Sequence, residues 1–95
     1  MDEHNNETEV LERALNTYGS TAQITMVFEE MSELQKELCK YLRGDGSFKN
    51  IAEEIADVEI MLEQMKILFY CAFDVLVARR RKVQRLEKRL DGIEE

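Results

Sequence analysis

Four acidic side chains, arranged as two pairs, are the residues of this chain whose type and spacing point most clearly to chemistry. Glu30 and Glu33 are three residues apart, and so are Glu54 and Asp57. Residues at this spacing lie on one face of a helix. If the two faces meet, four carboxylates converge, and such a group is stable only when it is protonated or neutralised by a hard cation such as Mg²⁺. We therefore expect a divalent-cation site.

Spacing alone is weak evidence, because acidic pairs are common in a chain with 20 Asp and Glu among 95 residues. The position of Glu54 on its helix is stronger evidence. A helical projection predicts an inward apolar stripe around it. The stripe consists of Ile51, Ile55, Val58, Met61, Leu62, Met65 and Phe69. Glu54 falls inside the stripe, Asp57 borders it, and Glu30 borders a similar seam on its own helix, whereas Glu33 lies farther round. Three interpretations of Glu54 stay open: a metal ligand, a buried structural ion pair, or a tolerated charge at the edge of the core.

Periodicity and punctuation predict four helices and no strand. The absence of Pro and the presence of only four Gly also favour an all-α chain. We expect residues 1–6 to be a flexible tail and residues 7–95 to form a single domain, with helices over about 7–18, 20–42 and 51–69 and a fourth that follows Asp74. The fourth could equally continue the third. The expected caps are Asn6, Asn50, Asp74 and a capping box from Ser20 to Gln23.

Two of these helices have further apolar positions that we expect to face inward. They are Val10, Leu11, Ala14, Leu15 and Tyr18 in the first helix, and Ile24, Val27, Met31, Leu34, Leu38 and Tyr41 in the second. A chain of 95 residues buries only a modest core, and these faces are too extensive for it to cover alone. We therefore expect a homo-oligomer.

Charge and composition narrow the possible partners and compartments. The net charge of −7 argues against nucleic acid. We expect no membrane association, because no uncharged run is long enough to span a bilayer and no signal peptide is evident. Cys39 and Cys71 lack the spacing of a metal or redox site, so we expect two buried free thiols in a cytoplasmic protein.

A basic segment near the end of the sequence contrasts with this acidity. Residues 74–91 carry seven Lys and Arg against three Asp and Glu, a net charge of +4, which leaves −11 for the rest. Lys82 and Arg85, three residues apart beside an apolar stripe, are candidates for binding phosphate. A purely solvated basic face is the other interpretation, and both stay open.

The acidic motifs resemble those of a known family. Glu29-Glu30-Met31-Ser32-Glu33 followed by Glu54-Ile55-Ala56-Asp57 is similar to the EExxE and ExxD motifs of the MazG-like all-α nucleoside triphosphate pyrophosphohydrolases. The resemblance covers about residues 18–90. It implies a four-helix bundle-like subunit that assembles into a homodimer or homotetramer, with its site where subunits pack.

The resemblance also implies an activity, the hydrolysis of an NTP or dNTP to the monophosphate and pyrophosphate by metal-activated water. It assigns Mg²⁺, or Mn²⁺ in its place, to Glu30, Glu33, Glu54 and Asp57, and a second metal or the orientation of water to Glu29. Phosphate would be bound by Lys82 and Arg85, and the base would be bordered by Gln23 and Tyr18. Capping is the other role open to Gln23.

A non-catalytic helical adaptor with a structural acidic cluster is the alternative function. Nucleic-acid binding through the run from Arg79 to Lys82 is a third, which the overall acidity and the lack of aromatic residues within the run oppose.

Overall fold

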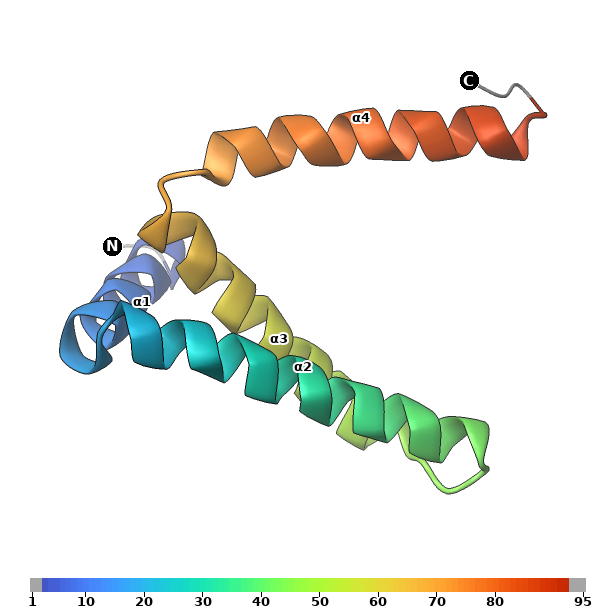
Figure 1. Cartoon of the computed structure of the whole chain (residues 1–95), viewed down its shortest axis with the longest axis horizontal. Coiled ribbons are helices and arrows are strands. Elements are labelled where there is room, and N and C mark those ends of the chain that lie inside the picture. The colour runs from blue at the N-terminus through green and yellow to red at the C-terminus, as the bar shows by residue number, and fades with distance from the viewer. Residues whose placement is uncertain (1–2, 93–95) are drawn as a thin grey trace.

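The computed structural model describes residues 3–92, and this part of the chain is all-helical (Figure 1). The helices are α1 (Glu3–Tyr18), α2 (Ser20–Leu42), α3 (Phe48–Leu68) and α4 (Ala72–Leu90). The predicted all-α class is confirmed. None of these helices has the length and apolar composition needed to cross a membrane.

The starts of α1 and α2 differ from the expected ones. α1 begins at Glu3, so residues 3–6 are helical where we expected a tail, and Asn6 lies inside the helix instead of capping it. This stretch contains no Gly or Pro that would break a helix. Acidic residues near a helix N-terminus also stabilise the helix by interacting with its dipole. α2 does begin at Ser20, but its N-cap is Gly19 and no side chain caps it, so the expected capping box with Gln23 is absent.

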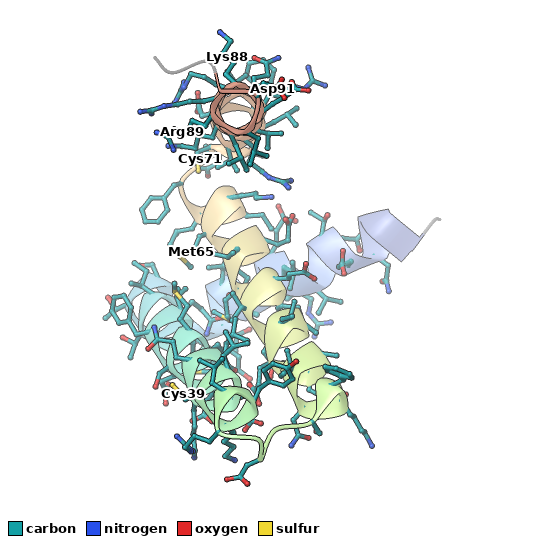
Figure 2. All side chains as sticks on the ribbon, turned by 90° about the vertical axis from the view of Figure 1, so that its right-hand side faces the viewer. Cys39, Met65, Cys71, Lys88, Arg89 and Asp91 are labelled. Atoms are coloured by element: carbon teal, nitrogen blue, oxygen red, sulfur yellow. The ribbon has the colours of Figure 1, made fainter. Side chains whose placement is uncertain are left out.

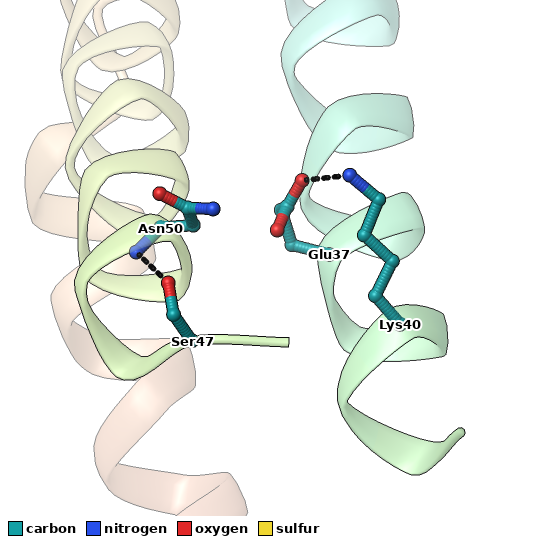
Figure 3. Close-up of polar contacts among 4 residues, drawn as sticks. All are labelled: Glu37, Lys40, Ser47 and Asn50. Carbon is teal, nitrogen blue, oxygen red and sulfur yellow. Dashed lines mark hydrogen bonds and ion pairs between the residues drawn. The ribbon is translucent and has the colours of Figure 1, made fainter. Parts of the chain in front are cut away.

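The starts of α3 and α4 also correct the expectation. Ser47, in an extended conformation, caps α3 in place of Asn50, and its hydroxyl accepts a hydrogen bond from the Asn50 backbone N–H at 3.1 Å (Figure 3). The N-cap of α4 is Cys71, which makes no side-chain cap, and Asp74 lies in the first turn. An acid placed there still interacts favourably with the helix dipole.

α2 ends in a glycine-dependent turn that reverses the chain. Gly44 has φ of 85°, its N–H donates to the Tyr41 carbonyl at 3.0 Å, and the Asp45 N–H donates to the Lys40 carbonyl at 2.9 Å. These two bonds form the motif that commonly closes a helix with a left-handed residue. The five-residue connection 43–47 then leads directly into α3.

α3 ends with the same motif, but Tyr70 takes the left-handed position with φ of 53°. Its N–H donates to the Ile67 carbonyl at 3.3 Å, and the Cys71 N–H donates to the Lys66 carbonyl at 3.1 Å. A non-glycine residue is uncommon in this conformation. α3 and α4 are therefore separate helices, and the alternative of one continuous helix is wrong.

The hairpin of α2 and α3 is the centre of the molecule. These two antiparallel helices make the most extensive contact, and α1 packs across both near the end where α2 begins (Figure 1). α4 leaves the end of α3 and touches only that helix, with its side chains spread around it on all sides (Figure 2). α4 is thus an arm that projects from the hairpin.

The core is smaller than expected. Among residues 6–92, Leu11 and Met61 are the only buried apolar residues, while Gln23, Glu37 and Gln64 are buried polar ones. Several side chains that we expected to face inward are exposed: Val10, Tyr18, Met31, Leu38, Tyr41, Ile55, Leu62 and Phe69. The reason on α3 is a rotation, because this helix packs through Met61 and Gln64, which turns one edge of the apolar stripe outward.

The thiols also differ from the expectation. Cys39 is exposed and Cys71 is half-buried, and both are free. Cys39 lies on the side of α2 that does not face α3, as its exposure requires. The expected burial of both thiols is therefore wrong.

Gly46 fixes the loop of the hairpin, because a Cβ there would lie 2.8 Å from the backbone N and Cα of Tyr41. We predict that Gly46→Ala lowers the free energy of unfolding by about 1–3 kcal/mol, the usual cost of overpacking. Urea unfolding followed by circular dichroism measures the change. Asp45→Ala, at an exposed neighbouring position, is the control, and equal midpoints for the two variants would contradict the prediction.

Candidate metal centre

Three of the four expected carboxylates meet between α2 and α3. Oxygen atoms of Glu30, Glu54 and Asp57 all lie within 4.8 Å of one another, and all three residues are half-buried. Glu33 is exposed and lies outside this group, because three residues along α2 carry it sideways from the surface that faces α3. We call the three residues the acid cluster.

The proximity of these carboxylates changes their protonation. Partial burial, followed by the neighbouring Asp57, raises the pKa of Glu30 above its ordinary value of 4.5. The same two causes raise the pKa of Glu54, with further contributions from Glu33 and Glu37. Burial and like charge both disfavour the ionised form, so the shifts have the sign expected of a crowded acidic site.

No basic side chain within residues 6–92 forms an ion pair with the acid cluster. The ion pairs in this part of the chain join Lys40 to Glu37 at 3.2 Å and Lys66 to Glu63 at 2.7 Å. Within residues 6–92, Glu54 is therefore not half of an ion pair. Closely placed carboxylates without a counter-charge are the donor set that a hard divalent cation prefers.

A heptad register explains why polar groups line the hairpin. Glu30 and Asp57 face each other, and the positions seven residues away on antiparallel helices must face each other as well. In one direction this step leads to Gln23 and Gln64, which are both buried. In the other it leads to Glu37 and Asn50, whose side chains point toward one another across α2 and α3 in Figure 3.

Glu37 and Gln64 are the residues of this site that our sequence analysis missed. Glu37 is 7% exposed, and its Oε2 accepts from Lys40 while its Oε1 is buried without a hydrogen-bond partner. The Oε1 of Gln64 is in the same state. Each buried acceptor without a partner lowers the free energy of unfolding by about 1–3 kcal/mol. The spacing of seven between Gln23, Glu30 and Glu37 was the available signal.

The remaining expected site residues lie outside the acid cluster. Glu29 is exposed beside Glu30, and its charge contributes to the raised pKa of Glu30. Tyr18 is exposed at the end of α1, whereas Gln23 is buried in the hairpin and caps nothing. No atom of these three residues belongs to the cluster.

Lys82 and Arg85 are exposed on α4, apart from the acid cluster. Lys82 is ten residues into α4, about 15 Å along it, and Asp57 lies about 16 Å before the end of α3. The two helices meet only at their junction. A single chain in this conformation does not bring these basic groups to the acids.

Comparison of the chain with family models, with curated proteins and with solved structures finds no match. The resemblance to the MazG-like family therefore rests on the motifs quoted above.

The raised pKa values predict a pH-dependent effect of Glu54→Gln. Between pH 4.5 and the raised pKa the folded chain holds its proton more tightly than the unfolded chain does, so stability falls as pH rises through this window. Without added metal, Glu54→Gln should unfold at a higher temperature than the wild type at pH 7, and the difference should shrink below pH 4.5. Thermal unfolding across this pH range measures it, with Glu59→Gln, at an exposed position of α3, as the control.

A Glu54→Gln chain that is less stable than the wild type at pH 7 would contradict the repulsion described here.

Proposed function

We propose that the chain is a Mg²⁺-dependent nucleoside triphosphate pyrophosphohydrolase that converts an NTP or dNTP to its monophosphate and pyrophosphate. The observation that carries this proposal is the acid cluster, three carboxylates within 4.8 Å that no cation of the described chain balances. The order and spacing of the acidic motifs along α2 and α3 add to it.

Each acidic residue has a role in this proposal. Glu30, Glu54 and Asp57 would hold the ion. Glu33 lies outside the acid cluster but is near enough to raise the pKa of Glu54, and its side chain would turn toward the ion as a fourth ligand. Glu29, exposed beside Glu30, would orient the attacking water. Held by these residues, a divalent ion would offset the negative charge of the triphosphate and activate water, so no nucleophilic side chain would be needed.

Burial of the cluster supports the same role. Half-buried carboxylate oxygens, such as those of the acid cluster, interact with a cation more strongly than fully solvated ones do. The unpaired buried oxygens of Glu37 and Gln64 add negative electrostatic potential to the interior of the hairpin. This environment favours a cation at Glu54 over a free carboxylate.

Substrate binding requires more than one chain in this proposal. Lys82 and Arg85 would bind phosphate oxygens, and Gln23 and Tyr18 would border the base. Because α4 holds its basic groups away from the acids of its own chain, we propose a homodimer or homotetramer in which they act on a neighbouring copy. The proposed setting is the cytoplasm.

The activity is tested by pyrophosphate release from eight nucleotides, four NTPs and four dNTPs, with Mg²⁺ or Mn²⁺. We expect turnover of at least one nucleotide, and a loss of about 100-fold or more in kcat/KM for Glu54→Gln and for Asp57→Asn, because each removes a charged ligand. Glu59→Gln, an exposed acid of α3, should retain activity. Circular dichroism confirms that each variant is folded.

The non-catalytic adaptor gives a different set of results. In that case no nucleotide turns over with either metal ion. The greater stability of metal-free Glu54→Gln is expected for the adaptor as well, because the same repulsion is relieved, so turnover is the measurement that separates the two functions. Turnover that survives both substitutions would exclude the acid cluster as the metal site.

Metal binding is tested separately by thermal unfolding. At a Mg²⁺ concentration of 100 times Kd, a site present only in the folded state stabilises it by about 2.7 kcal/mol. We expect the wild type to gain at least about 5 °C in Tm, and Glu54→Gln to gain much less. Na⁺ at equal ionic strength is the control, and an equal gain with Na⁺ would show general screening only.

A further inference from the structure

Glu37 and Lys40 of α2 form an ion pair that has no role in the chemistry proposed above. The Lys40 Nζ lies 3.2 Å from the Glu37 Oε2, and 10% of the Glu37 side chain is exposed. Glu63 and Lys66 of α3 form a pair with the same spacing, but 48% of the Glu63 side chain is exposed. Surface pairs of this kind contribute little to stability, whereas a buried acid opposes folding. The pair at Glu37 therefore requires an explanation that the pair on α3 does not.

The buried pair lies next to the acid cluster, on the side of the hairpin loop. Glu37 follows Glu30 by seven residues, which is about 10.5 Å along α2. Glu54 precedes Asp57 by three residues, which is about 4.5 Å in the same direction because the helices are antiparallel. The step that remains from Glu54 to Glu37 along the hairpin is therefore about 6 Å. Consistent with this short step, the charge of Glu37 contributes to the raised pKa of Glu54.

The Lys40 side chain points back toward the acid cluster. In Figure 3 it runs along α2 toward the earlier turns of that helix and ends at Glu37. This is the usual direction, because side chains of an α-helix are tilted toward its N-terminus. The contact with Glu37 holds the ammonium group at the height of that residue. Because 37% of the Lys40 side chain is exposed, a ligand can still reach it.

The proposed substrate requires a cation at this position. A triphosphate carries more negative charge than one divalent ion offsets, and the carboxylates of the acid cluster add repulsion. Lys82 and Arg85 of the same chain do not reach the cluster, because α4 meets α3 only at their junction. A chain of three phosphates is long enough to extend from an ion at the acid cluster to the Lys40 ammonium group. Positive side chains placed along such a chain stabilise its charge.

We propose that Lys40 binds a phosphate oxygen of the triphosphate whose neighbouring phosphate is held at the acid cluster. An ammonium group has three donors, so it can keep its bond to Glu37 and donate to phosphate at the same time. This inference rests on the proposed function, because it requires a cation at the acid cluster. It adds to that function a phosphate contact supplied by the same chain that holds the ion.

The other role open to Lys40 is purely structural, to compensate the buried charge of Glu37. Removal of Lys40 would then lower the free energy of unfolding, because a buried charge would lose its partner, and would leave the affinity for phosphates unchanged. Binding measurements on folded variants therefore separate the two roles.

Calorimetric titration of the full chain, with Mg²⁺ alone and with inorganic tripolyphosphate in the presence of Mg²⁺, tests the proposal. Lys40→Gln should weaken tripolyphosphate binding about 10-fold or more, because a charge-assisted hydrogen bond is lost. It should not weaken the binding of Mg²⁺ alone. Lys40→Arg keeps the charge and should recover most of the affinity. Lys66→Gln makes the same change in the pair on α3 and should leave both affinities unchanged.

Chemical footprinting of the wild type decides the result even if Lys40→Gln does not fold. Acetylation followed by mass spectrometry measures how fast each lysine reacts. Mg²⁺ and tripolyphosphate together should protect Lys40, and Mg²⁺ alone should not. Lys66 should react equally under all conditions.

The outcomes separate this inference from the proposed function. Equal tripolyphosphate affinity of Lys40→Gln and wild type, an unprotected Lys40, or a wild type that binds no tripolyphosphate would each overturn the inference. A wild type that binds tripolyphosphate through Lys40 but hydrolyses no nucleotide would contradict the proposed function and support the inference. Turnover that Glu54→Gln abolishes and Lys40→Gln leaves intact would do the reverse.

Discussion

The packing of α2 against α3 is the constraint on which the rest of this structure depends. It forces carboxylates from both helices within 4.8 Å of one another and buries further oxygens from Glu37 and Gln64 in the same interface. A helix pair stabilised only by its apolar contacts would not be expected to retain such groups at its centre, because each of them opposes folding. The residues that oppose folding are therefore the same ones that form the candidate metal site.

The small apolar core makes the free energy cost of burying these polar groups important for stability. With Leu11 and Met61 as the only buried apolar residues among 6–92, one chain has little hydrophobic stabilisation to set against three crowded acids. Two contributions can offset the deficit: a cation at the acid cluster, and the proposed association with a neighbouring copy. Each would bind the folded chain and not the unfolded one, so folding, metal binding and association are expected to be coupled.

The helices, and the proximity of three of the four acidic side chains, could be predicted from sequence because both follow local periodicity. The rotation of α3 about its axis could not be predicted. Its apolar residues cover a wide part of the helix surface, and their pattern does not show which edge packs against the rest of the chain. Ile55 and Leu62 were therefore assigned to the core although they are exposed. Glu37 has no acidic residue three positions before or after it, so the spacing that identified the other acids did not point to it. The end of the third helix near residue 69 could be predicted, but the left-handed backbone of Tyr70 could not, because a tyrosine gives no sign of that conformation.

The connection from Arg43 to Ser47 has a consequence for how this chain can vary. Gly46 packs closely against the Tyr41 backbone, so the loop is tightly held. The length of the loop determines which residues of α2 and α3 lie opposite each other. Inserting one residue into the first turn of α3 would rotate the acids beyond it by 100° and shift them by about 1.5 Å. Point substitutions act on one layer of the hairpin at a time, whereas a single insertion or deletion at this bend would misalign every layer at once.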